Sequence, residues 1–181
     1  MNLKVGVLLL AIILLSCSLG LAAENLREVP GVGTVIFPEE IVLLPAEENQ
    51  FRLLVNDNGI LRGCQLSFGP PLAGVFRDKV KDNTSMTDDL TSMSTRYRDI
   101  LLKEVPQVKL LEDTPLDLEA LNNEQFIIRS TTLFLKGQAI HYDYYAVDST
   151  EGLRLVSVTF TDSNREFWRS KIPSIIANIQ R

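Results

Sequence analysis

The sequence predicts an α+β fold in which a single antiparallel β-sheet is flanked by two or more α-helices, after an N-terminal signal peptide. Three observations carry this prediction. Short polar turns join successive β-rich runs, which favours antiparallel pairing. Two segments place apolar residues at helical spacing, and the elements follow in the order strands, helix, strands, helix. A basic start followed by a short apolar run is typical of a secretory leader.

Residues 1–23 are the predicted signal peptide. Lys4 is the only charged residue before Glu24, and the run from Val5 to Leu15 contains only apolar residues and glycine. This run is shorter than the about 20 residues that a transmembrane helix needs. The pattern therefore favours a leader, and we expect no transmembrane span in the mature chain.

Two processing routes remain open for this leader. Small side chains near Ala22 and Ala23 suit ordinary cleavage after either residue. Alternatively, Leu14-Leu15-Ser16-Cys17 resembles a bacterial lipobox, in which Cys17 is acylated and becomes the mature N-terminus. The protein is therefore expected to be exported, either free in the periplasm or outside the cell, or held at the membrane as a lipoprotein.

Residues 24–181 are the predicted single α+β domain, which is long enough for one substantial core. The formal net charge of the chain is −5. An acidic surface repels phosphate backbones, so we expect no nucleic-acid partner. After ordinary cleavage Cys64 is the only cysteine that remains, so no internal disulfide is expected.

The start of the domain is predicted to be β-rich. Residues 24–32 are expected to form an extended lead-in. The stretch GTVIFPEEIVLLP, residues 33–45, contains two short β-rich runs broken by Pro38. Proline cannot donate to a strand ladder, which predicts an edge strand or a strand-turn-strand unit here.

Residues 51–68 are predicted to form a β-hairpin. The turn Asn56-Asp57-Asn58-Gly59 separates the runs 51–55 and 60–68, and Asn-Gly readily takes the positive φ that tight hairpins need. A loop is expected to begin at Gly69-Pro70-Pro71, because these residues interrupt regular structure.

Residues 85–105 show the clearest helical pattern, with apolar residues at steps of three and four. Pro106 is expected to end this helix. A short strand is predicted over 108–113. The domain then turns strongly β-rich from residue 125 onward.

A three-strand antiparallel meander is predicted from the runs 125–135, 139–147 and 153–161, which short polar turns connect. A C-terminal amphipathic helix closes the chain. Pro173 lies inside its pattern and is expected to kink that helix or split it in two.

Several stretches of the sequence together resemble the PsbP-like fold group, which includes DcrB-type periplasmic proteins. These stretches are GTVIFPEEIVLLP, MTDDLTSMSTRYRDILLKEV, KGQAIHYDYYAV, LRLVSVTFT and the closing helix ending SIIANI. The resemblance covers roughly residues 31–180. Members of that group are mostly non-catalytic. The resemblance therefore implies a binding or assembly module, and it identifies neither a partner nor site residues.

The lone histidine marks the first candidate ligand-binding site. On an alternating strand His141 shares one face with Asp143 and Tyr145, and a His-Asp pair of this kind can titrate near neutral pH or hold a metal. A metal site is not expected, because the histidine and cysteine spacings of zinc sites are absent from the sequence. Cys64 and His141 fall in separate predicted strands, and the sequence leaves open whether they meet.

The sequence contains no G-x-S-x-G elbow, phosphate-binding loop or dinucleotide fingerprint, so no cofactor is expected. We therefore expect an exported, non-enzymatic cell-envelope protein that binds a protein partner. The alternative is a periplasmic protein that binds a small molecule or a metal through His141, Asp143 and Tyr145. An enzyme that uses Cys64 or His141 is the least favoured possibility.

Overall fold

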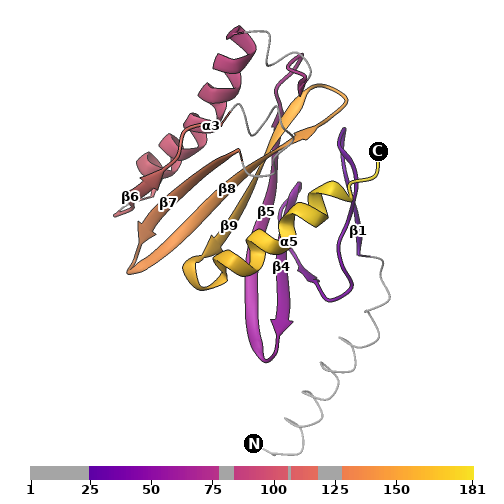
Figure 1. The fold of residues 1–181 in the computed structure, drawn as a ribbon, viewed down its shortest axis with the longest axis vertical. Coiled ribbons are helices and arrows are strands. Elements are labelled where there is room, and N and C mark those ends of the chain that lie inside the picture. The colour runs from indigo at the N-terminus through magenta and orange to yellow at the C-terminus, as the bar shows by residue number, and fades with distance from the viewer. Residues whose placement is uncertain (1–24, 78–83, 106, 118–127) are drawn as a thin grey trace, which may run out of the picture.

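The computed structural model describes residues 25–77, 84–105, 107–117 and 128–181. Over these residues the fold is mostly β-sheet, with two antiparallel sheets and two α-helices (Figure 1). The predicted leader, including Cys17, lies outside the described residues and stays a prediction. The elements are β1 (Leu26–Val29), β2 (Gly33–Ile36), β3 (Val42–Leu44), β4 (Gln50–Asp57), β5 (Ile60–Pro71), α3 (Thr84–Glu104), β6 (Lys109–Asp113), β7 (Arg129–Leu135), β8 (Gln138–Asp148), β9 (Leu153–Thr161), the 3-10 turn η1 (Asp162–Asn164) and α5 (Arg165–Ala177).

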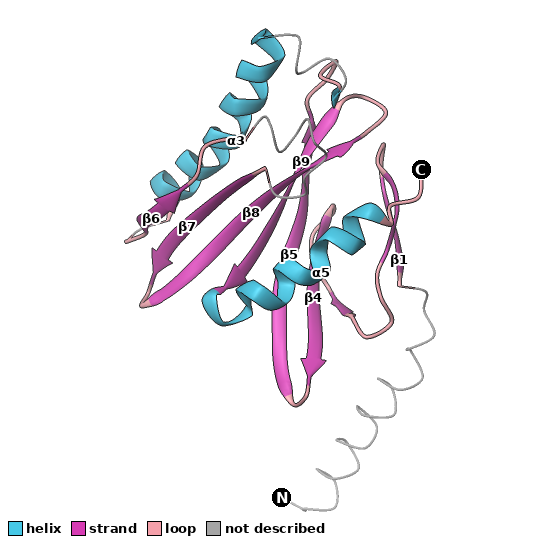
Figure 2. Ribbon diagram, viewed as in Figure 1, coloured by secondary structure: helices cyan, strands magenta, loops and turns pink. Residues whose placement is uncertain are grey.

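The larger sheet has seven strands in the order β3-β4-β5-β9-β8-β7-β6. All its neighbouring pairs are antiparallel, which confirms that part of the prediction. The expectation of a single sheet was wrong, because β1 and β2 form a separate two-stranded sheet (Figure 2). The predicted lead-in folds back as a hairpin at Gly31, whose φ of 75° permits the tight turn. The chain end then pairs with β2, through Gln180 and Thr34.

The predicted hairpin is present as β4 and β5. Asn58 and Gly59 have φ values of 51° and 86°, as the turn signal requires. The loop expected at residue 69 is absent, because β5 continues to Pro71 beside β9. Its register shifts between Phe68 and Pro71, which is a bulge at the point where two successive prolines offer no N–H to the ladder.

Helix α5 lies along one face of the larger sheet (Figure 1). Trp168, Ile172 and Ile175 are fully buried in a cluster with side chains from β4, β5, β8 and β9. The predicted C-terminal helix is confirmed, but Pro173 does not split it, since α5 runs without interruption to Ala177. The buried isoleucines on both sides of Pro173 hold the helix against the sheet despite the lost backbone hydrogen bond.

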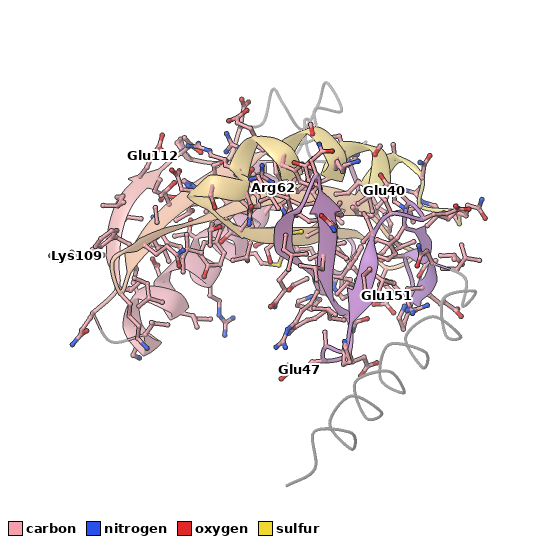
Figure 3. All side chains as sticks on the ribbon, turned by 90° about the horizontal axis from the view of Figure 1, so that it is seen from below. Glu40, Glu47, Arg62, Lys109, Glu112 and Glu151 are labelled. Carbon is pink, nitrogen blue, oxygen red and sulfur yellow. The ribbon has the colours of Figure 1, made fainter. Side chains whose placement is uncertain are left out.

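Helix α3 confirms the predicted middle helix and packs on the opposite face of the sheet (Figure 3). Leu90 is fully buried in a second cluster with Tyr144, Leu153 and Leu155. Asp113 of β6 accepts hydrogen bonds from Arg129, Thr131 and Arg98. Burial alone would raise the pKa of Asp113, but these donors outweigh it and lower the pKa, so the carboxylate stays charged and ties α3 and β6 to β7.

Candidate functional site

The three predicted ligand-binding residues lie on one face of β8, as their spacing indicated. His141, Asp143 and Tyr145 are 3%, 0% and 0% exposed. All three point toward the side of the sheet that α5 covers. The prediction that these three residues share a face of the strand is therefore confirmed. They are buried, however, because helix α5 covers that face.

The Asp143 carboxylate is engaged by groups of the protein itself. Arg169 of α5 donates from Nε to Oδ2 at 2.7 Å and from Nη2 to Oδ1 at 2.8 Å. Ser130 Oγ donates to Oδ1 at 2.6 Å. The hydrogen bond to Asp143 raises the pKa of the Arg169 guanidinium. This ion pair fastens α5 to the sheet and leaves Asp143 little capacity for a ligand.

His141 lies between a hydroxyl and a carboxylate. Its Nδ1 is 3.0 Å from Thr132 Oγ1, and its Nε2 is 2.8 Å from Asp162 Oδ1. A hydroxyl, an imidazole and a carboxylate in line also occur in nucleophilic triads. In such triads the hydroxyl faces the substrate and the carboxylate is buried. Here Thr132 is buried, while the Asp162 side chain is 72% exposed. The hydroxyl cannot meet a substrate, so the arrangement instead holds η1 against β7 and β8.

Cys64 and Tyr145 are also enclosed. Burial raises the pKa of the Cys64 thiol, which keeps it in its unreactive protonated form. Burial likewise raises the pKa of the Tyr145 hydroxyl. Cys64 and His141 do not meet, because β9 runs between their strands and separates them by two strand spacings, about 10 Å. These groups form parts of the core.

The described residues also bear on metals and membranes. Among them, no three His, Cys, Asp or Glu side chains gather closely enough to hold a metal ion. Within the same part of the chain, neither helix combines the length and the apolar character needed to cross a bilayer.

A different surface of the sheet is accessible. In β3, β4 and β5 alternate side chains point away from α5, and none of these joins the α3 cluster among the residues described. Figure 3 shows the two sides, with Arg62 on the side of α5 and Glu47 on the opposite side. We call the exposed and half-buried residues on this side of the sheet the open face: Val42, Leu44, Gln50, Arg52, Leu54, Asn56, Leu61, Gly63, Gln65, Ser67, Ser157 and Thr159.

One end of the open face is apolar. Val42 and Leu44 of β3 are 44% and 43% exposed, and Leu61 of β5 is 64% exposed, so large aliphatic side chains from two strands of this face are open to solvent. Val42 pairs across the strands with Leu54, and Leu54 pairs with Gly63. A Cβ placed on Gly63 would find no heavy atom closer than 3.9 Å. Gly63 therefore leaves room beside Leu54 for at least a Cβ in ordinary contact, and we call this space the slot.

Arg52 occupies the middle of the open face. It pairs across the strands with Leu44 on one side and Gln65 on the other. It is the only charged residue of the open face as defined above. Among the described residues Arg52 has no hydrogen-bond or ion-pair partner, whereas Arg62, Arg98 and Arg169 each contact a carboxylate.

The other end of the open face is hollow and is lined by both polar and apolar groups. A pocket of about 480 Å³ is lined by residues that include Gln50, Ser67, Ser157 and Tyr144. The bulged end of β5 forms part of its wall, through Gly69, Pro70 and Pro71. Gln65 Nε2 donates to Gln50 Oε1 at 2.9 Å, which fixes the amide at the edge of this hollow. The volume lies within the range of about 300–1,000 Å³ that is usual for small-ligand sites.

The open face was not identified from the sequence, although a signal was present. The run FRLLV places Leu53 and Val55 on one face of β4, where they are buried, and Arg52 and Leu54 on the other. Apolar residues on both faces of a strand predict either a second covering layer or a contact surface. Only the positions of the helices distinguish these two cases.

Comparison with known proteins gives little further information. No protein-family model matches the chain, and no curated protein is similar to it. A crystal structure from Bacteroides thetaiotaomicron matches with a TM-score of 0.37 and 12% sequence identity. The match covers 76% of this chain and 41% of the other, so this chain spans less than half the length of that protein. A similarity of this size carries no argument about function.

Proposed function

We propose that the protein is an exported, non-catalytic binding module of the cell envelope that recognises its partner through the open face. The observation that carries this proposal is that, among the residues the structure describes, one sheet face combines exposed aliphatic side chains, an arginine without a partner and a pocket of about 480 Å³. Stable protein interfaces combine an apolar centre with arginine and a polar rim.

Binding is favoured over catalysis because of where the reactive groups lie. The imidazole of His141, the carboxylate of Asp143 and the thiol of Cys64 are all buried beneath α5 or within the core. The open face offers amides, hydroxyls, aliphatic groups and the guanidinium of Arg52, and the wall of its pocket adds the charged side chains of Glu48 and Arg154. Such groups recognise a partner by shape and hydrogen bonding, whereas acid-base or nucleophilic catalysis needs converging titratable groups.

Export follows from the leader pattern in residues 1–23, and both processing routes remain part of the proposal. Cleavage after Ala22 or Ala23 gives a free protein, and acylation of Cys17 gives one that is anchored beside the membrane. In either case the open face is available to other components of the envelope.

Photo-crosslinking in intact cells tests this proposal. A photoreactive amino acid at position 65, on the open face, is expected to yield a discrete adduct. The same residue at position 170, on the exposed side of α5, is the matched control and is expected to yield none. Mass spectrometry of the product distinguishes a polypeptide from a small molecule and also reports the mature N-terminus. Identical adducts from both positions, or none from position 65, would contradict the proposal.

A further inference from the structure

The open face is organised in rows that cross the strands. One row contains Gln50, Ser67 and Ser157, and the next contains Leu44, Arg52 and Gln65. A third row contains Val42, Leu54 and Gly63. Successive rows lie two residues apart along each strand, which corresponds to about 7 Å.

We propose that the open face docks an extended acidic-apolar segment of a partner polypeptide. An acidic side chain of that segment would face Arg52, and an apolar side chain two positions along would enter the slot beside Leu54 where Gly63 has no side chain. This inference rests on the proposed function and specifies the chemistry of the partner that the protein binds.

The spacing supports an extended partner. In an extended chain, side chains two residues apart point the same way and lie about 7 Å apart, which matches the distance between rows. An acid and an apolar group at that spacing can therefore reach the arginine row and the apolar row together. A helix would present its side chains at steps of three and four residues, with a different spacing.

The charge distribution supports an acidic partner. Arg52 is surrounded on the sheet by the neutral residues Leu44, Gln50, Leu54 and Gln65. Within the described part of the chain this guanidinium has no partner, so it can form a charge-assisted, two-point hydrogen bond with an incoming carboxylate. The net charge of −5 repels an acidic segment over the surface as a whole, so the attraction that Arg52 exerts is local to this face.

Gly63 provides a substitution that separates docking from folding. No positive φ is required at this position, and a Cβ added there would make only ordinary van der Waals contacts, 3.9 Å from Leu53 O and Leu54 Cδ1. Gly63→Val is therefore expected to leave the melting temperature unchanged or higher, because glycine weakens strand interiors and valine favours them. The same valine would fill the slot beside Leu54.

The test uses three fluorescent peptides that differ at one position. In the first, Asp and Leu stand two positions apart among threonines, and the other two carry Asn or Lys in place of Asp. By fluorescence anisotropy the wild-type protein is expected to prefer the Asp peptide over the Lys peptide. Arg52→Glu is expected to lower the affinity for the Asp peptide by about tenfold, and the variant should prefer the Lys peptide over the Asp peptide. Lys136→Glu, in the turn between β7 and β8, changes the net charge equally and should leave the preference intact.

Gly63→Val should bind all three peptides more weakly than the wild type, while its melting temperature is maintained. The inference is overturned if no peptide binds, if Arg52→Glu leaves the preference unchanged, or if Gly63→Val binds as tightly as the wild type. If no peptide binds but position 65 still yields an adduct in cells, the acidic-apolar partner is rejected and the proposed function stands. Loss of that adduct would reject both.

Discussion

Replacing Arg169 with Met is expected to lower the free energy of unfolding by about 3–5 kcal/mol, because the fully buried Asp143 carboxylate loses its counter-charge. Ser130 would remain as a hydrogen-bond donor, but a hydroxyl cannot compensate a buried charge. Urea denaturation measures the change.

Lys171→Met on the same helix is the control for this experiment. Its ion pair with Glu40 is exposed, so its loss should cost only about 0–1 kcal/mol. The double substitution Asp143→Leu with Arg169→Met should recover most of the stability, since an apolar pair replaces the ion pair. If Arg169→Met unfolds like the wild type, then the Asp143 group does not fasten α5. The predicted ligand site at His141, Asp143 and Tyr145 would then regain support.

Trp168→Ala is expected to destabilise the protein by about 3–5 kcal/mol, since it removes a fully buried indole from the cluster between α5 and the sheet. The Trp168 ring also forms an edge contact with Phe167, with ring centroids 5.2 Å apart. Chemical denaturation followed by circular dichroism reports this loss without relying on tryptophan fluorescence.

Trp168→Phe distinguishes the packing of the ring from its polar group. The indole Nε1 is buried and has no hydrogen-bond partner among the described residues. Removing that N–H should therefore cost little, and Phe should keep the loss below about 1.5 kcal/mol. A loss with Phe as large as that with Ala would contradict this explanation, because it would assign the stabilisation to the N–H group.

Local sequence patterns were sufficient to predict those structural features that depend only on residues close together in the chain. Alternation in β8 predicted that His141, Asp143 and Tyr145 share a face, and the Asn-Gly turn predicted the β4–β5 hairpin. The same patterns could not predict that Arg169, which lies 26 residues beyond Asp143, would occupy its carboxylate. That contact depends on where α5 crosses the sheet, which no periodicity specifies.

Tertiary context also overrode two local rules. Gly69-Pro70-Pro71 normally interrupts a strand, yet β5 continues through it because β9 supplies a partner on one side and a bulge absorbs the mismatch. Pro173 should interrupt a helix, yet Ile172 and Ile175 bury α5 on both sides of it. The open face escaped prediction for a related reason, since Arg52 and Leu54 become a surface only because α3 packs over other strands.

The most direct test of the account is to map backbone amide chemical shifts of the isotope-labelled protein as the Asp-containing peptide is added. The account predicts perturbations in β3, β4, β5 and the adjoining part of β9, with the largest near Arg52, Leu54 and Gly63. Perturbations centred on α5 and His141, or none at all, would contradict the claim that the open face is the recognition surface.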